Sequence, residues 1–509
     1  MKQTVRSRST RLAIVAVAVM LAGAGGLTAC ASGGTEVARV FGGFTNPFAA
    51  DEKSAESVET FRQLFDQYAK RDSSRNQQLR HFRDAYLRVR QEYVQSIDDT
   101  VLIKAAVDGV KKLDGEPGTF TAAQVTEAAL DGMLTNLDPH SSYLNPDEFR
   151  ESQVTTRGEF GGLGIEVNME DGFVKVIAPI EDTPASRAGI KSGDLITHVD
   201  GAGIKGMSLI EAVRLLRGKP RTDVRLTIRR AGAGEFDVTV TRAIIRVRPV
   251  KWSIEGEVGI IRVTSFNQRA DDEMRRAVSA IRGKLGGKLR GFVLDLRNNP
   301  GGLLSQSVAV TDSFLHRGDI VSVRDRDGNG RAFNAETGDL ADGLPIVVLI
   351  NRGSASASEI VAGALQDQNR ATVIGARSFG KGSVQTITPL DWDGALRLTT
   401  ALYYLPSGRS IQGTGVEPDI VITGANARLH PRRGDFPGRL LPDKEADVPH
   451  ALQVEKHRPK PAQAKIRLDD CPGAGTDDKD RMLGCAVTLI NDGGSEAKFL
   501  ARFGSRTKL

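Results

Sequence analysis

Short apolar runs alternate with helix-like segments between residues 258 and 374, and this order most constrains how the chain can fold. The strand-like runs are Val258–Val263, Gly291–Leu296, Ile346–Ile350 and Ala371–Ile374. The helix-like segments are Asp271–Lys284, Leu303–Phe314 and Ser358–Gln368. Such alternation predicts an α/β core with a largely parallel sheet. Two loops, Asn298–Gly302 and Gly353–Ser356, follow strands at the edge where sites form in such sheets.

Ser356 and Lys381 have sequence surroundings that suit a nucleophile and its base. Ser356 lies at a predicted helix start, where the N–H of Ala357 and the helix dipole favour a developing oxyanion. Lys381 lies in a Phe-Gly-Lys-Gly turn without an acid within five positions. Burial there can lower the lysine pKa from its usual value of about 10.4, as a base requires. The alternative for Ser356 is structural, because Ser356 and Glu359 match a capping box.

A histidine base has little support in the α/β region. His316 lies there without a motif around it. The other histidines lie elsewhere in the chain: His81, His140, His198, His430, His450 and His457. His140 lies in a polar turn, where we favour capping or packing over catalysis. A Ser-His-Asp triad is therefore not predicted.

Residues 157–247 have the pattern of a small β-rich domain. Gly161–Ile165 is glycine-rich and leads into an alternating strand, and Asp171-Gly172 predicts a tight hairpin turn. The segment resembles a PDZ domain of the bacterial protease-associated type. Consecutive N–H groups of such a loop can hold a terminal carboxylate, and the edge strand can pair with a peptide. Leu163, Gly164 and Ile165 are the candidate binding residues; the alternative is an ordinary β-domain whose glycines only make turns.

Residues 57–156 are predicted to be helical. One apolar stripe with helical spacing consists of Leu79, Phe82, Tyr86, Val89 and Tyr93. Such a stripe can be a core face or a dimerisation seam. We favour the core face, and leave open a homo-oligomer through the N-terminal helices.

Residues 1–29 have the pattern of a lipoprotein-type signal peptide. Basic residues precede an apolar stretch from Leu12 to Leu27. The sequence Leu27-Thr28-Ala29-Cys30 resembles the bacterial lipoprotein box, which implies that Cys30 carries a lipid. We therefore expect export to the bacterial periplasm and anchoring to a membrane, with residues 30–56 as a tether. The alternative is plain secretion, with Cys30 incidental.

The C-terminal part has a different composition. Residues 425–468 are proline-rich and predict a linker, and residues 469–509 predict a small C-terminal segment, so we expect a partly disordered tail. Cys471 and Cys485 are expected to pair, because export places them in an oxidising compartment. Two cysteines without nearby histidines make a poor zinc site. We expect no metal and no cofactor.

The charge of the chain gives no indication of nucleic-acid binding. The net charge is +6, and the basic residues are dispersed rather than gathered with aromatic residues. We therefore expect no nucleic-acid partner.

Four motifs together resemble those of the C-terminal processing peptidases, which are tail-specific serine proteases with a PDZ domain. They span residues 295–302, 353–360, 379–385 and 413–420. The order of helical segment, PDZ domain and core (residues 248–424) is also similar. The resemblance implies an α/β multidomain chain with a crotonase/ClpP-like core. It also implies cleavage of exported polypeptides near their free C-termini through an acyl-enzyme intermediate.

The resemblance also assigns roles to residues. Ser356 is implied to be the nucleophile, Lys381 the general base and Gln385 the residue that orients the lysine. The N–H groups of Gly302 and Ala357 are implied to form the oxyanion hole, with Gly301 as a competitor of Gly302. The PDZ domain is implied to bind the substrate C-terminus and to gate the site.

Two other functions stay open at this stage. In the first, the PDZ-like domain recruits C-terminal tails to an inactive core, although Ser356, Lys381 and Gln385 are all intact. The second is acyl-CoA chemistry on a crotonase-like scaffold, which export from the cofactor pool disfavours. Residues 115–126 look like an insertion relative to the family. An adaptor or activator is left open.

Overall fold

The computed structural model describes residues 52–180, 182–207, 209–336, 338–391, 394–424, 452, 464–475 and 480–503. The expected signal peptide, Cys30 and most of the expected tether and linker lie outside these residues. Within this part of the chain, helices that are both long and apolar enough to cross a membrane are absent.

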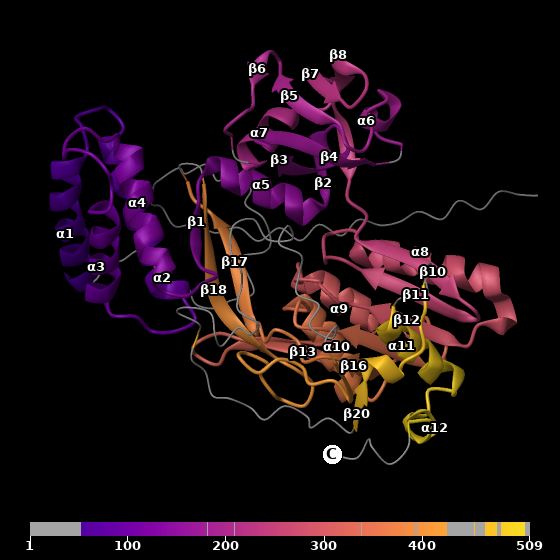
Figure 1. The fold of residues 1–509 in the computed structure, drawn as a ribbon. Coiled ribbons are helices and arrows are strands. Elements are labelled where there is room, and N and C mark those ends of the chain that lie inside the picture. The colour runs from indigo at the N-terminus through magenta and orange to yellow at the C-terminus, as the bar shows by residue number, and fades with distance from the viewer. Residues whose placement is uncertain are drawn as a thin grey trace, which may run out of the picture. The chain divides into compact units, whose positions relative to one another are not determined.

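Four helices of the N-terminal segment pack around one apolar core (Figure 1). They are α1 (Glu52–Tyr68), α2 (Arg75–Glu92), α3 (Asp99–Val110) and α4 (Ala122–Thr135), and α5 (Pro146–Arg157) follows. The apolar stripe of α2 faces this core, since Phe82 and Tyr86 are fully buried and Val89 is 1% exposed. The stripe is therefore a core face within the chain rather than a free seam.

The β-rich domain contains a sheet with strand order β3-β4-β5-β7-β8. Its strands are β3 (Ile165–Glu170), β4 (Phe173–Pro179), β5 (Leu195–Val199), β7 (Asp223–Arg230) and β8 (Gly234–Thr241). Shorter elements complete it: β2 (Glu159–Gly162), β6 (Ala202–Gly203), β9 (Ala243–Arg246), α6 (Pro184–Arg187) and α7 (Leu209–Leu216). The predicted hairpin turn lies between β3 and β4, and β3 is an edge strand of this sheet.

A seven-stranded sheet forms the α/β core, in the order β10-β11-β12-β15-β16-β19-β20. Its strands are β10 (Val250–Glu255), β11 (Val258–Val263), β12 (Gly291–Asp295), β15 (Ile346–Ile350), β16 (Thr372–Gly375), β19 (Ile420–Thr423) and β20 (Ala464–Arg467). All neighbouring pairs are parallel except β10 and β11. The largely parallel α/β core expected from the alternating pattern is confirmed.

Alternate residues of each core strand pack against different helices. One face of the sheet carries α8 (Ala270–Leu285), α9 (Leu304–Asp312) and α10 (Ala357–Asp367), and the short η2 (Gly286–Lys288) follows α8. The opposite face, which includes Val293 and Leu349, is covered by α11 (Arg481–Asn491). The core is thus closed on both sides, as a parallel sheet requires.

A second sheet connects the helical segment to the core. It contains β1 (Ser142–Leu144), β13 (Asp319–Arg324), β14 (Gly330–Asn334), β17 (Ser383–Pro389) and β18 (Ala395–Tyr404). β1 pairs with one end of β18, and β13 pairs with the other. Residues on β17 and β18 are therefore held between the N-terminal helices and β13 of the α/β region.

The C-terminal segment is part of the core. β20 extends the large sheet, so the last residues of the expected linker are structured where they pair with β19. After β20 come η5 (Leu468–Asp470), α11 and α12 (Glu496–Ala501). A disulfide joins the buried Cys471 and Cys485, with their Cα atoms 5.1 Å apart. By loop entropy it contributes about 3 kcal/mol of stability.

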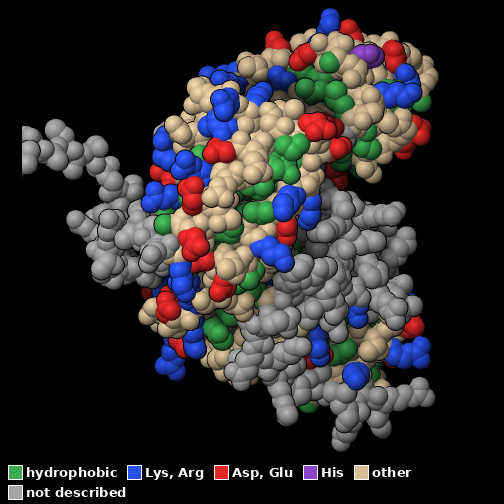
Figure 2. Space-filling view, turned by 90° about the vertical axis from the view of Figure 1, so that its left-hand side faces the viewer, with side chains coloured by type: hydrophobic (Ala, Val, Ile, Leu, Met, Phe, Trp, Pro, Cys, Tyr) green, Lys and Arg blue, Asp and Glu red, His purple; other side chains and the backbone are tan. Residues whose placement is uncertain are grey.

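Charged side chains of both signs are interspersed over the face of the molecule drawn in Figure 2. Ion pairs account for many of the arginines, including Arg75 with Asp66 and Arg217 with Glu151. Over its described residues, this face therefore shows no broad field of one sign that would attract a polyanion.

Candidate active site

Ser356 lies immediately before α10, in a backbone conformation that few residues other than glycine adopt. Its φ is 55° and its ψ is −115°. Such a conformation costs about 1–3 kcal/mol and persists only where the surroundings impose it. Ala357 is the first residue of α10, where a backbone N–H has no partner within the helix. The side chain of Ser356 and this N–H thus belong to one sharp turn.

The loop Asn298–Gly302 lies against this turn. A Cβ atom on Gly301 would be 2.8 Å from the Cβ of Ser356 and 3.0 Å from the nitrogen of Ala357, so position 301 requires glycine. The N–H of Gly301 donates to Oδ1 of Asn299 at 2.9 Å. For the N–H of Gly302, no acceptor is found among the described residues.

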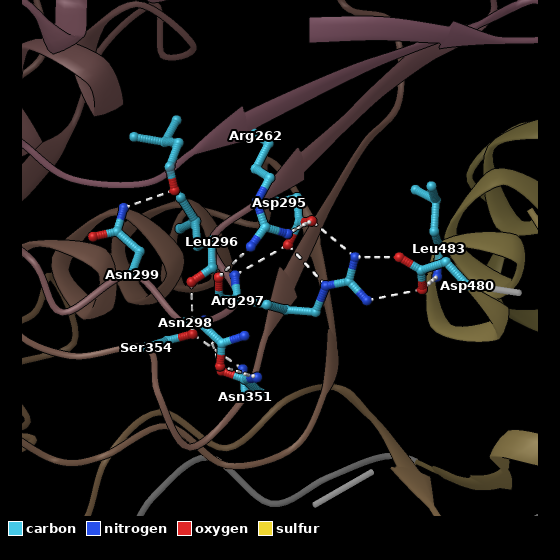
Figure 3. Close-up of polar contacts among 11 residues, drawn as sticks. Arg262, Asp295, Leu296, Arg297, Asn298, Asn299, Asn351, Ser354, Asp480 and Leu483 are labelled. Atoms are coloured by element: carbon cyan, nitrogen blue, oxygen red, sulfur yellow. Dashed lines mark hydrogen bonds and ion pairs between the residues drawn. The ribbon is translucent and has the colours of Figure 1, made fainter. Parts of the chain in front are cut away.

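Polar contacts hold the two loops together. The carbonyl oxygen of Asn299 accepts from the N–H of Ala355 at 3.0 Å and from Oγ of Ser358 at 2.9 Å. Asn351 and Asn298 exchange two further hydrogen bonds, of 2.9 and 2.8 Å. Figure 3 shows the contacts between Asn298 and Asn351 beside the hydrogen bond from Ser354 to the carbonyl of Leu296. The glycine loop and the serine turn therefore form one connected unit.

Glu359 joins the serine turn to the lysine turn. It is fully buried, and one carboxylate oxygen, Oε2, accepts from the N–H of Ser356 at 2.7 Å and from the N–H of Lys381 at 2.9 Å. The other oxygen accepts from the N–H of Gly380 at 2.7 Å and from the hydroxyl of Ser378. Burial raises the pKa of Glu359 to about 7, although these hydrogen bonds oppose the shift.

The main chain of Lys381 is fixed on its other side as well. Its carbonyl accepts from the hydroxyl of Tyr403, and the next N–H, that of Gly382, donates to Oε1 of Gln412 at 2.8 Å. Phe379 is buried and packs against Ala355 of the serine turn. The lysine turn is thus bound to the serine turn by polar and apolar contacts.

Gln385 lies on β17 and contacts β18. Its Nε2 donates to Oγ of Ser383 at 3.0 Å and to Oγ1 of Thr399 at 3.3 Å. Thr399 in turn donates to the carboxylate of Asp138 at 3.1 Å. Asp138 is fully buried and also accepts from the hydroxyl of Ser141 at 2.6 Å. A buried polar chain therefore runs from the N-terminal turn at 138–141 to Gln385.

The candidate peptide-binding loop lies at the start of β3. Gly164 has φ 81°, and a Cβ there would be 2.3 Å from Thr183, so this position also requires glycine. The carbonyls of Leu163 and Gly164 accept from the N–H groups of Ala185 and Ile180. This leaves the loop directly before an edge strand, as a peptide-binding PDZ domain requires.

Glu359 connects Ser356 to Lys381, and Gly301 packs directly against Ser356 and Ala357. Leu163–Ile165 belong to the separate β-rich domain. Sequence reasoning missed two groups near the site, the buried Asp138 and the buried Arg297. Arg297 could have been found from the sequence, because it lies beside Asp295, its ion-pair partner, in the first motif. Its second partner, Asp480, lies far away in the sequence and could not have been found in this way. Over the described residues, clusters of metal-ligating side chains are absent.

Comparisons with known proteins identify the class. A model of peptidase family S41 matches residues 257–422, and a PDZ domain model matches residues 175–230. The chain is 51% identical over 348 residues to the carboxy-terminal-processing protease of Bartonella bacilliformis, covering 68% of this chain and 75% of that protein. The molecule is thus a serine-type peptidase with a PDZ domain. It belongs to peptidase family S41, as a C-terminal-processing protease.

Further likenesses are more distant. The chain is 38% identical to a protein named "Probable CtpA-like serine protease" of Staphylococcus aureus, over 59% of this chain and 60% of that one. A solved structure of the photosystem II D1 C-terminal processing protease is 30% identical, with a TM-score of 0.43, over 68% of this chain and 92% of that one.

Proposed function

We propose that this protease cleaves polypeptides near their C-termini with a Ser356–Lys381 dyad. The hydroxyl of Ser356 attacks the scissile carbonyl while the neutral amine of Lys381 takes its proton. The carbon–nitrogen bond then breaks, and the lysine returns the proton to the leaving amine. Water hydrolyses the resulting ester by the same route in reverse. Gln385 orients the lysine.

One observation carries this proposal: a single oxygen of the buried Glu359 accepts from the backbone N–H groups of both Ser356 and Lys381. A carboxylate that binds both main chains fixes the separation of the two turns. Catalysis needs this, because reacting groups must be held within a fraction of an ångström. Burying a carboxylate costs free energy unless it is fully hydrogen-bonded. An apolar residue at this position would avoid that cost if Glu359 only supported the fold.

We assign the oxyanion hole to the N–H groups of Gly302 and Ala357. Gly302 is favoured over Gly301 because the N–H of Gly301 already donates to Asn299. The N–H of Ala357 lies at the start of α10, where the helix dipole adds to its effect. These two donors stabilise the negative charge of the tetrahedral intermediate.

The PDZ domain binds the substrate C-terminus through Leu163–Ile165, and the substrate pairs with β3 as an added strand. In this proposal the same domain gates the site. The edge position of β3 supports the strand pairing. A polypeptide with a free C-terminus should be cleaved faster than its amidated form, and mass spectrometry of the products would report both the preference and the cut position.

The first prediction concerns the dyad itself. Ser356→Ala and Lys381→Ala should each lower kcat by more than about 10³-fold, because neither residue acts without the other. Turnover of an unstructured polypeptide and covalent labelling by a fluorophosphonate would be measured. Lys288→Ala, on η2, is the matched lysine control and should keep wild-type activity. Wild-type turnover in Ser356→Ala would overturn the assignment.

We also propose that the protein is exported and anchored by a lipid on Cys30. The disulfide between Cys471 and Cys485 supports export, since such bonds persist in oxidising compartments. The mature wild-type protein should be heavier than the Cys30→Ser protein by the mass of the lipid. Equal masses without lipid would exclude the anchor.

A further inference from the structure

The helix α11 reaches the active site from outside the part of the chain that matches the S41 family model, which ends at residue 422. Met482, Leu489 and Ile490 of this helix are buried against the core sheet. Gly291 on β12 makes room for it, since a Cβ there would lie 2.7 Å from Ile490. The helix is therefore docked on β12, the strand that leads into the glycine loop Asn298–Gly302, which is called the oxyanion loop below because it contains the proposed donor Gly302.

The start of α11 is fixed by Asp480. Its Oδ1 accepts from the N–H of Leu483 at 3.0 Å, so Asp480 caps the helix. The same carboxylate accepts from both terminal nitrogens of Arg297, at 2.9 and 2.7 Å. Figure 3 shows the guanidinium of Arg297 between Asp295 and Asp480. This two-pronged contact fixes the direction of the arginine as well as its position.

Arg297 is almost entirely buried, with 5% of its side chain exposed. It also donates to both oxygens of Asp295, at 2.8 Å each, and Arg262 donates to the same carboxylate at 2.9 Å. Two arginines thus face two carboxylates. Loss of the Asp480 charge would leave Arg297 and Arg262 to share the single carboxylate of Asp295, and the surrounding backbone would have to adjust.

The backbone that would adjust is the oxyanion loop. Arg297 directly precedes Asn298, which has φ 57° and opens the turn that ends at Gly302. The carbonyl before Arg297, that of Leu296, accepts from Oγ of Ser354 at 2.8 Å in the serine turn. A movement of Arg297 would therefore be passed to Gly302 on one side and to the serine turn on the other.

We propose that Asp480 is a positioning residue for the oxyanion loop, acting through Arg297. The disulfide assists it by tying α11 to the segment after β20. Cys485 lies on α11, and the carbonyl of Cys471 accepts from Nη1 of Arg481, next to Asp480, at 3.0 Å. This inference rests on the proposed oxyanion hole. It predicts that loss of Asp480 lowers kcat and leaves KM nearly unchanged, because the loop acts on the intermediate rather than on substrate binding.

The test compares full-length wild-type protein with Asp480→Asn, which keeps a capping oxygen but removes the charge. We expect kcat to fall about tenfold, less than the 10²–10³-fold typical of deleting an oxyanion donor. The rate of labelling of Ser356 by a fluorophosphonate should fall similarly. Asp480→Glu keeps the charge and should recover part of the loss.

Asp492→Asn is the matched control. Asp492 pairs with Nε of Arg502 at 2.7 Å in the same C-terminal segment but contacts no residue of the oxyanion loop among those described. It should keep wild-type kcat. The double variant Cys471→Ser, Cys485→Ser removes the disulfide and should also have a lower kcat than wild type. This variant tests the inference if Asp480→Asn does not fold.

The outcomes separate this inference from the proposed function. Turnover by Ser356→Ala would remove the proposed function and this inference with it. An inactive Ser356→Ala together with wild-type kcat in folded Asp480→Asn would overturn the inference alone. A loss that appears only as a raised KM, or equally in Asp492→Asn, would also overturn it, since either result indicates a general structural role.

Discussion

Two segments outside the matched family core approach the proposed active site, and they do so with different chemistry. The N-terminal turn at residues 138–141 reaches Gln385 through Thr399, by hydrogen bonds around the fully buried Asp138. The C-terminal helix α11 reaches the proposed oxyanion loop through the ion pair of its capping residue Asp480 with Arg297, and the Asp480 side chain is 36% exposed. The first segment contacts the lysine side of the proposed site, and the second contacts the glycine loop.

The difference indicates how each contact responds to conditions. A buried carboxylate surrounded by hydroxyl and backbone donors is shielded from salt. An ion pair whose carboxylate is partly exposed is weakened by salt and lost when that carboxylate is protonated. We therefore expect the hydrogen bonds from Asp138 to Gln385 to change little with salt or pH. We expect the ion pair between Asp480 and Arg297 to weaken at high salt or low pH.

The largest effect is predicted for Asp138→Ala. Asp138 accepts from the N–H groups of His140 and Ser141, from the hydroxyl of Ser141 and from Thr399. Removing it leaves several buried donors unpaired, each at a cost of about 1–3 kcal/mol, so the free energy of unfolding should fall by about 3 kcal/mol or more. Urea denaturation would measure it, with Asp480→Ala for comparison. A greater loss of unfolding free energy in Asp480→Ala than in Asp138→Ala would contradict this prediction.

A smaller effect is predicted for Thr399→Val, which removes the hydroxyl between Gln385 and Asp138. The free energy of unfolding should fall by about 1–2 kcal/mol, and kcat should fall several-fold because Gln385 loses a partner. Thr399→Ser keeps the hydroxyl and is the control. If Thr399→Val destabilises the protein but leaves kcat unchanged, the buried chain supports the fold without supporting catalysis.

The smallest effect is predicted for acid. Burial alone would raise the pKa of Asp480, but the hydrogen bonds and charge of Arg297 outweigh it and lower the pKa. The contribution of the ion pair to stability is therefore present above the ordinary aspartate pKa and is lost as pH falls through the lowered value. Its size should be at most about 1 kcal/mol, since the pair is partly exposed.

The acid prediction is checked by the difference in unfolding free energy between wild type and Asp480→Asn. This difference should shrink as the pH falls below about 4 and should also shrink with added salt. A difference that stays constant over both ranges would show that Asp480 acts as a cap and not as a charge.

The order of elements in the core could be predicted from the sequence because its strands are short apolar runs between polar turns. β11, β15 and α10 lie within one or two residues of the predicted ranges. β20 was expected to be linker, since Ala464–Arg467 contains little apolar sequence. It becomes a strand through pairing with β19 and burial of Ile466 under α11.

The site was predictable only where its residues are neighbours in sequence. The capping-box pattern indicated that Glu359 reaches back to Ser356, and it does so. The same pattern gave no sign that Glu359 also binds Gly380 and Lys381, because those contacts depend on tertiary structure. Arg297 and Asp480 are 183 positions apart, and a local motif cannot connect them.

The backbone of Ser356 carries a further consequence. At φ 55° and ψ −115° the position suits glycine better than any residue with a side chain, so the hydroxyl is retained there against the preference of the main chain. Selection for stability alone would favour glycine at this position. Because we propose that Ser356 is the nucleophile, we expect a descendant without protease activity to replace this serine early.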